Sequence, residues 1–303
     1  MVERCYVRAV QDEDIPPIGT RLLNRYRLDE ELARGGVGVI FRALDLDLDR
    51  DVALKILPLS LDAGTKRERF LREAKIAATI GHPHVVKLHD FGFYDDPRRQ
   101  RRPFLVMELL EGASLASQLR RQGPLGIADS CALASQLCSA LTALHSKGIV
   151  HRDVKPGNVF LLDALGVTMK LIDFGMSKSF LDDTDAITEA GRVIGTPSYM
   201  APEQLLGGAP DPRWDVYGVG LVMWEALVGV PYVKPQKTIE KTFRVVLERE
   251  REPPSRLRGK IPDYLDALVV RAIAADPAER YADCAQMKKA CDDAWERVSK
   301  ELG

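Results

Sequence analysis

The chain has few cysteines, no excess of either charge and no long apolar run, and each absence excludes a class of protein. Five cysteines, an odd number without C-x-x-C spacing, exclude a disulfide framework and a zinc finger. Lys and Arg number 43 against 44 Asp and Glu, so the net charge of −1 gives no general attraction to nucleic acid or to acidic lipid. We therefore expect no nucleic-acid partner.

The most apolar stretch, Val216–Val230, contains Glu225 and is shorter than the roughly 20 residues that a bilayer requires. The first residues, Met1–Cys5, lack the apolar region of a secretory signal. We expect no membrane span and a cytoplasmic location. In a reducing cytoplasm we expect four of the five cysteines to be small core residues. They form two pairs, each seven residues apart: Cys131 and Cys138, and Cys284 and Cys291. With 303 residues, the chain is long enough for one large domain or two lobes.

What the chain does have is an unusually polar octapeptide, His151–Asn158, between two apolar regions. Before it, leucines recur every three or four residues, which predicts a helix over Asp129–Lys147. After it, Val159–Leu162 and Met169–Ile172 read as two short strands. A polar loop held on both sides by core elements is a typical position for chemistry.

This octapeptide resembles the catalytic loop of serine/threonine protein kinases, H-R-D-x-K-x-x-N. Asp173-Phe174-Gly175 and Ala201-Pro202-Glu203 follow in the order of that family, and the resemblance covers residues 25 to 302. It implies an α+β, bilobal fold, with a small antiparallel β lobe with one helix at about 25–110 and a larger helical lobe at about 111–303. Residues 1–24 are expected to be an N-terminal extension, and the nucleotide to lie between the lobes.

The resemblance also implies roles for single residues. Asp153 would accept the proton of the substrate hydroxyl, and Lys155 would neutralise charge on the transferred phosphoryl group. Asn158 and Asp173 would hold Mg²⁺ against the phosphates of ATP. The expected partners are proteins with Ser or Thr acceptors.

A glycine-containing hairpin near the N-terminus resembles the phosphate-covering loop of the family. Glycine lets backbone N–H groups approach a triphosphate that a Cβ would obstruct. Ala33 replaces the first glycine of the pattern, from which we expect weakened or unchanged nucleotide affinity. The return strand is expected at Phe41–Leu44. The implied nucleotide-binding positions here are Leu32, Ala33, Arg34, Gly35, Gly36, Val37, Gly38, Val39 and Ile40.

Lys55 lies in the apolar strand Val52–Leu57, and Glu73 falls on the apolar stripe of a helix predicted over Lys66–Ile80. A buried charge is costly without a partner, so the two side chains are expected to pair. The alternative is a Lys55 that extends to solvent and an exposed Glu73. In the family the corresponding pair holds the α- and β-phosphates.

The resemblance places the adenine against a second set of residues. Met107 corresponds to the gatekeeper, and the backbone of Glu108 and Leu110 would contact the adenine edge. Phe160 would lie beneath the adenine together with Ala53. The nearby basic run Arg98–Arg102 is interpreted as a solvated strand connection without a function, and the alternative is a basic docking patch.

The polar segment 176–193 resembles an activation loop, in which Thr188 is the expected phosphorylation site and Thr184 its competitor. Phosphate on Thr188 would pair with Arg152. Gly195-Thr196-Pro197-Ser198-Tyr199 resembles the substrate-docking segment of the family, in which Thr196 would bond to Asp153 or Lys155.

Two structural contacts are also expected: an ion pair between Glu203 and Arg280, and Asp215 supporting the catalytic loop from a helix buried on every side. The last helix is expected to bury one stripe: Met287, Cys291, Ala294, Trp295, Val298 and Leu302.

The implied function is transfer of the γ-phosphoryl group of ATP to Ser or Thr of proteins, with autophosphorylation in the activation loop. The alternative is a pseudokinase that binds nucleotide as a scaffold, which would be expected to lack Lys55, Asp153, Asn158 or Asp173. A small-molecule kinase would be expected to lack Gly195-Thr196-Pro197 and Ala201-Pro202-Glu203. The protein substrate, the activating signal and the oligomeric state are left open by the sequence.

Overall fold

The computed structural model describes residues 15–35, 38–57, 65–96, 101–162, 168–173, 197–234 and 236–302. The chain divides into two compact units. Unit 1 comprises Met1–Gly81, Val86–Leu110 and Met176–Ile194, and unit 2 comprises His82–Val85, Glu111–Gly175 and Gly195–Gly303. Several predicted positions lie outside the described residues: Gly36, Val37, Phe174, Gly175, Thr184, Thr188 and Thr196.

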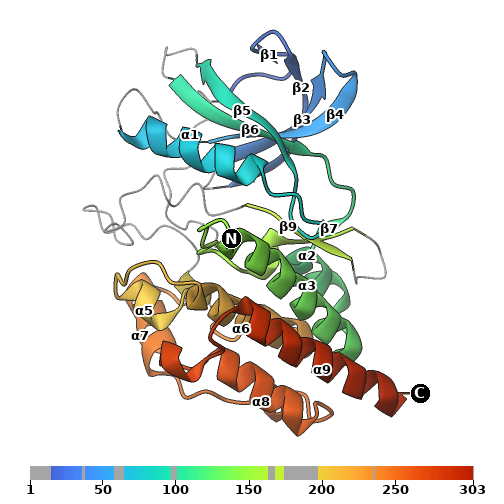
Figure 1. Ribbon diagram of the computed structural model, residues 1–303, viewed down its shortest axis with the longest axis vertical. Coiled ribbons are helices and arrows are strands. Elements are labelled where there is room, and N and C mark those ends of the chain that lie inside the picture. Colours follow the sequence, from blue (N-terminus) through green and yellow to red (C-terminus); the bar gives the residue numbers. More distant parts are fainter. Residues whose placement is uncertain are drawn as a thin grey trace. The chain divides into compact units, whose positions relative to one another are not determined.

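Unit 1 is built on a six-stranded antiparallel sheet in the order β1-β2-β3-β4-β6-β5 (Figure 1). The sheet forms because alternating apolar residues of neighbouring strands meet in one core that includes Leu28, Phe41, Leu54 and Phe104, each at most 1% exposed. The strands are β1 Arg21–Leu22, β2 Tyr26–Gly35, β3 Gly38–Asp45, β4 Arg50–Ile56, β5 Leu88–Asp95 and β6 Arg101–Glu108. β4, which carries Lys55, is an inner strand between β3 and β6.

The helix of unit 1, α1 (Thr65–Ala78), packs against β5. Phe70, Ala74 and Ala77 are buried at the three- and four-residue spacing of one helix face. Glu73 is half-buried beside that face, so the apolar stripe passes through Ala74.

Three details of unit 1 differ from the sequence-based expectations. The sheet already begins at β1, within the segment expected to be an extension, and the strand after the hairpin starts at Gly38 rather than Phe41. Arg102 is 6% exposed, and its Nε lies 2.9 Å from Oδ2 of buried Asp96. The prediction of a solvated basic run was therefore wrong for Arg102, because a carboxylate on the neighbouring strand end compensates its buried charge.

Unit 2 is helical, with one small sheet of β7, β8 and β9 (Figure 1). α3 packs against both α6 and α9 and forms the centre of the unit. The strands are β7 Ala113–Ser114, β8 Val159–Leu161 and β9 Met169–Leu171. The α-helices are α2 Leu115–Gln122, α3 Ile127–His145, α5 Pro202–Leu205, α6 Arg213–Val228, α7 Ile239–Glu248, α8 Asp263–Ala272 and α9 Cys284–Leu302. The 3-10 turns are η2 Pro156–Asn158, η3 Pro197–Tyr199, η4 Pro254–Arg256 and η5 Pro277–Glu279.

α6 confirms the prediction of a helix buried all round, since every residue from Trp214 to Leu227 is buried. The helix ends at Gly229, whose φ of +83° is left-handed and suits glycine. Within the described parts of the chain, α3 is the one helix that is long and apolar enough to cross a membrane by composition, and it is a core helix with ten buried residues.

The cysteine prediction is confirmed: Cys131 and Cys138 on α3 and Cys284 and Cys291 on α9 are all buried free thiols. The α9 stripe was predicted correctly for most of its members but wrongly for Trp295, which is 45% exposed. Met287, Ala294 and Val298 already cover the inward face, and Trp295 follows Ala294 by one residue, which turns its side chain about 100° away.

Candidate active site

The polar octapeptide forms an irregular loop between α3 and β8, and its last residues form the turn η2. The turn bonds Asn158 N to Lys155 O at 2.9 Å, and Asn158 O then accepts from Ile172 N at 2.9 Å. The backbone thus connects Asn158 directly to the residue before Asp173. Two predicted site residues far apart in sequence are brought together by these bonds.

Asp215, at the start of α6, holds the beginning of this loop. Its buried carboxylate accepts from the backbone N–H of His151 at 2.8 Å and of Arg152 at 2.9 Å, one on each oxygen. His145 Nε2 lies 2.7 Å from the same oxygen that His151 contacts. A carboxylate that receives three N–H donors is strongly held, so the predicted support from Asp215 is confirmed.

The side chains of the loop converge on the carboxylate of Asp153. Lys155 Nζ lies 2.8 Å from Asp153 Oδ2, and Asn158 Nδ2 donates to the same oxygen at 3.1 Å. Asn158 Nδ2 also donates to the carbonyl of Asp153 at 2.8 Å. Because the amide nitrogen is turned to Asp153, the amide oxygen of Asn158 is the atom left to accept a cation.

His151 connects the loop to the segment that carries Asp173. It is fully buried, and burial lowers the pKa of its imidazole below the ordinary 6.5, although Asp215 and Asp153 act in the opposite direction. The neutral ring fits its neighbours: Nδ1 accepts from Asp153 N at 3.3 Å, and Nε2 lies 3.3 Å from the carbonyl of Ile172. A proton on Nδ1 would face an N–H donor, so the site requires the neutral form.

Two residues of this site have strained backbones. Arg152 has a φ of +62° and Asp173 a φ of +61°, values that are uncommon for residues with a Cβ. Such conformations persist where the surroundings fix them, and they concentrate at functional sites. Two hydrogen bonds fix the backbone of Arg152: its N–H donates to Asp215, and its carbonyl accepts from Gln204 Nε2 of α5 at 3.1 Å.

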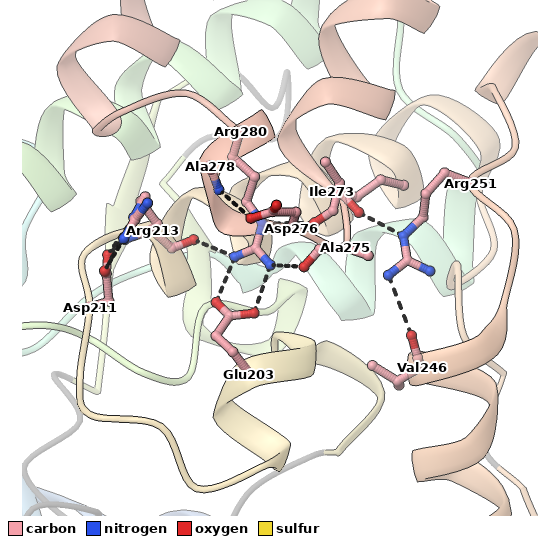
Figure 2. Close-up of polar contacts among 11 residues, drawn as sticks. Glu203, Asp211, Arg213, Val246, Arg251, Ile273, Ala275, Asp276, Ala278 and Arg280 are labelled. Atoms are coloured by element: carbon pink, nitrogen blue, oxygen red, sulfur yellow. Dashed lines mark hydrogen bonds and ion pairs between the residues drawn. The ribbon is translucent and has the colours of Figure 1, made fainter.

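The predicted pair of Glu203 and Arg280 is confirmed, and it is bidentate, with both N···O distances at 2.7 Å (Figure 2). Arg280 has a fully buried side chain, and it uses all five N–H donors. Its other acceptors are the carbonyls of Ala274 at 2.8 Å, Arg213 at 3.1 Å and Ala275 at 3.1 Å. One side chain therefore joins α5, the start of α6 and the segment after α8.

A second contact anchors η3, the turn that precedes Ala201. Tyr199 OH donates to Oε2 of Glu225 on α6 at 2.6 Å. Glu225 is 8% exposed, and burial raises its pKa, partly offset by the Tyr199 bond and by Arg120. This contact ties the predicted substrate-docking segment to α6.

The predicted nucleotide loop is the β2–β3 hairpin of unit 1. Ala33 pairs with Ile40 in the ladder, so an extended alanine is compatible with the hairpin. Gly35 has no atom within 4 Å of a Cβ built on it, which leaves its surface open. Gly38 is required for a different reason: its φ is +127°, and a Cβ would lie 2.1 Å from Ile56 O of β4. Leu32, Ala33 and Arg34 are exposed, Val39 is buried and Ile40 is half-buried.

The remaining nucleotide-binding candidates of unit 1 lie on β4, α1 and the end of β6. Lys55 is 2% exposed, which excludes the alternative of a side chain extended to solvent, whereas the predicted pair with Glu73 stays a prediction. Ala53 and Met107 are buried side by side as register partners on β4 and β6. Leu110 is half-buried, as is Phe160 of unit 2, whose adenine contact stays a prediction.

Glu108 has its backbone N–H committed within unit 1, where it donates to Lys87 O at 3.0 Å. Its side chain accepts from Lys87 N at 2.7 Å. An adenine contact from Glu108 is therefore expected through its carbonyl oxygen.

Sequence reasoning missed three positioning residues: His145, Gln204 and Glu225. A buried polar position within an apolar helix was the available signal for Glu225, which interrupts the α6 run. His145 and Gln204 gave no such signal, because each lies at a helix end where polar residues are ordinary.

Comparison with known proteins agrees with this geometry. Residues 26–295 match the family described as "Protein kinase domain". The chain is 36% identical over 268 residues to serine/threonine-protein kinase PknB of Mycolicibacterium smegmatis, which covers 88% of this chain and 42% of the relative. It is also 36% identical over 267 residues to serine/threonine-protein kinase PknA of Mycobacterium tuberculosis, covering 88% of this chain and 60% of the relative.

Among solved structures, the crystal structure of Rad53 1-466 in complex with AMP-PNP matches with a TM-score of 0.70 and 23% identity, over 90% of this chain and 66% of that one. This likeness concerns the fold, and it agrees with the predicted β-rich and helical parts. The chain spans about half the length of the curated relatives it matches. The chain belongs to the protein kinase family, in its eukaryotic-like serine/threonine (Hanks-type) group.

Proposed function

We propose that the chain transfers the γ-phosphoryl group of ATP to Ser or Thr hydroxyls of proteins, with Mg²⁺ as cofactor. The observation that carries this proposal is the convergence of Lys155 and Asn158 on Asp153 Oδ2, on a loop fixed by Asp215. Phosphoryl transfer requires positioning and charge neutralisation rather than covalent chemistry, and this group of side chains supplies both.

The donor set fits magnesium. Mg²⁺ prefers oxygen ligands and is usually held by one or two carboxylates together with substrate phosphates. Asn158, through its amide oxygen, and Asp173, through its carboxylate, would hold the ion, which would neutralise charge on the phosphates. Among the described residues there is no group of three or more His, Cys, Asp or Glu side chains that could hold a metal ion.

The chain's own residues perform the other steps. Asp153 orients the acceptor hydroxyl and takes its proton, while Lys155, 2.8 Å from that carboxylate, places a positive charge beside the transferred group. Lys55, buried on β4, would bind the α- and β-phosphates, and the β2–β3 hairpin would cover them. Thr188 is the proposed autophosphorylation site, and a cytoplasmic location is proposed from the sequence.

Labelled ATP with Mg²⁺ and a generic protein substrate tests the proposal. Asp153→Asn is expected to lower turnover by about 10²–10⁴ with nucleotide binding retained. Lys55→Met is expected to abolish the incorporation of labelled phosphate. Phosphosite mapping of the native protein identifies the autophosphorylated residues. Unchanged turnover in Asp153→Asn contradicts the catalytic assignment. Nucleotide binding without transfer by the native protein would support the pseudokinase alternative.

A further inference from the structure

α7 and the segment that leads into it carry a group of basic side chains that the proposed chemistry does not use. We call them the basic cluster: Lys234, Lys237, Lys241 and Arg244. All four are exposed, whereas Thr242 and Val246 turn inward and fix the helix to unit 2. The basic cluster is therefore a surface feature of a helix whose other side is anchored.

Some exposed basic residues elsewhere on unit 2 are neutralised by carboxylates, whereas the basic cluster gathers four exposed basic side chains between residues 234 and 244. On α9, Lys288 and Lys289 each have an aspartate partner four residues later, at 2.6 and 2.9 Å. Just after α7, Glu252 neutralises two arginines. Within the described residues, no member of the basic cluster has a carboxylate within 4.0 Å.

The two acidic residues of α7 offset only part of this charge, because residues 234–248 contain four basic and two acidic side chains. Glu240 is turned to the start of its own helix, where its backbone N–H and the Thr238 hydroxyl lower its pKa. Glu248 lies in the last turn, four residues beyond Arg244. The exposed side of the segment thus keeps an excess of positive charge, which attracts acidic partners over about 8 Å at physiological ionic strength.

The place of α7 in the fold gives this charge a use. α7 packs against η3 and α5. η3 contains Tyr199, and α5 contains Gln204, which donates to the carbonyl of Arg152, the residue before Asp153. The basic cluster therefore lies on and just before a helix that adjoins the predicted substrate-docking segment within one compact unit.

The sequence contains an acceptor of the matching chemistry. Thr184 and Thr188 are flanked by Asp182, Asp183, Asp185 and Glu189. A basic surface near the docking segment and acidic residues around the candidate acceptors are independent features of the chain, and their charges are complementary.

We infer that the basic cluster, on α7 and the segment before it, is a docking surface for an acidic polypeptide segment of the protein substrate, next to its acceptor Ser or Thr. This inference rests on the proposed function and specifies the substrate class for it. The attraction raises the association rate and the apparent affinity and leaves the chemical step unchanged, because none of the four residues belongs to the catalytic loop.

The first test measures binding without catalysis. A fluorescent peptide with the sequence of residues 180–191 is titrated with the full chain and followed by anisotropy, beside a matched peptide with its acidic residues changed to Asn or Gln. In the variant Lys237→Glu, Lys241→Glu, Arg244→Glu, affinity for the acidic peptide is expected to fall about tenfold or more at low salt, with the difference vanishing near 1 M salt. The neutral peptide is expected to bind both proteins equally.

The matched control is Lys147→Glu, Lys289→Glu, Lys300→Glu, which changes net charge equally on other exposed parts of unit 2. Equal loss of affinity in both triple variants would show a net-charge effect and overturn the inference. So would an acidic oligonucleotide of equal charge that binds more tightly than the peptide, because the cluster would then be a polyanion site.

The second test measures phosphorylation of the two peptides. The basic-cluster variant is expected to lose kcat/KM on the acidic peptide through KM, with kcat retained and the neutral peptide unaffected. A loss of kcat on both peptides would show that these residues affect folding or the chemical step, and it would refute the docking role. If the native protein phosphorylates neither peptide, the proposed function fails on these substrates, while the anisotropy result still decides whether the surface binds acidic segments.

Discussion

Asp215→Asn is the change that most directly tests how the catalytic loop is held. The carboxylate accepts the N–H groups of His151 and Arg152 on different oxygens, at 2.8 and 2.9 Å. Asparagine is nearly the same size but offers one oxygen and one NH₂ group. Whichever way the amide turns, one backbone N–H of the loop faces a donor.

The magnitude follows from burial. Asp215 is 1% exposed, so water does not replace the lost acceptor, and a buried unsatisfied N–H costs about 1–3 kcal/mol. His145 Nε2, at 2.7 Å, loses a charged acceptor as well if the NH₂ group takes that side. We therefore expect the free energy of unfolding to fall by about 2–4 kcal/mol.

The loop can relieve this cost by releasing Arg152 from its strained conformation, which would displace Asp153. Turnover is then expected to fall by about 10²-fold, as for other misplaced catalytic groups, while nucleotide affinity stays within a factor of a few. Urea unfolding gives the stability, and initial rates with labelled ATP give the turnover.

Asp211→Asn is the control. Asp211 also accepts from a backbone N–H, that of Arg213 at 2.8 Å, but its ion pair with Arg213 is roughly one-third exposed and is expected to contribute about 0–1 kcal/mol. A variant Asp215→Asn that keeps native turnover despite lower stability would refute the view that Asp215 positions Asp153.

Three further predictions follow from single contacts. Arg280→Met is expected to lower the free energy of unfolding, measured by urea titration, by about 3 kcal/mol. This is the low end for a broken buried ion pair, because the Glu203 side chain is 25% exposed, and a loss below 1 kcal/mol would contradict the prediction. Gly218→Ala is expected to cost about 1–3 kcal/mol and to lower turnover, since the new Cβ would lie 2.6 Å from Val154 Cβ, whereas Gly259→Ala, with open space around it, should do neither. Burial lowers the pKa of His151 below 6.5, so the folded protein keeps the ring neutral where the unfolded chain binds a proton. The free energy of unfolding is therefore expected to fall as the pH drops below 6.5, by up to about 1.4 kcal/mol per pH unit. The stability of His151→Asn should depend less on pH between 7.5 and 5.5, and an unchanged dependence would count against the neutral ring.

The sequence predicted those parts of the structure that local pattern and motif order determine. The loop 151–158 was recognisable because an apolar helix and two apolar strands enclose it, and α6 because it is apolar on all sides. The pair of Glu203 and Arg280 was predictable from the family resemblance, although 77 residues separate its members.

What the sequence did not predict are contacts that depend on which helix ends meet in space. His145 and Asp215 are 70 residues apart and lie on different helices, and neither position shows a pattern that points to the other. Arg102 was misassigned for a related reason. A basic run looks solvated until a buried carboxylate, here Asp96, is known to lie beside one member.

The polar contacts of unit 2 share one feature that explains why the catalytic loop can keep a strained backbone. Each irregular segment around Asp153 is tied to α6 or to a residue already tied to it: His151 and Arg152 through Asp215, and η3 through Tyr199 and Glu225. α6 itself is packed on every side, so it resists the small shifts that would relax a left-handed Arg152. The cost of the strained residues, about 1–3 kcal/mol each, is thus offset by the packing of a helix that contains none of the reacting groups.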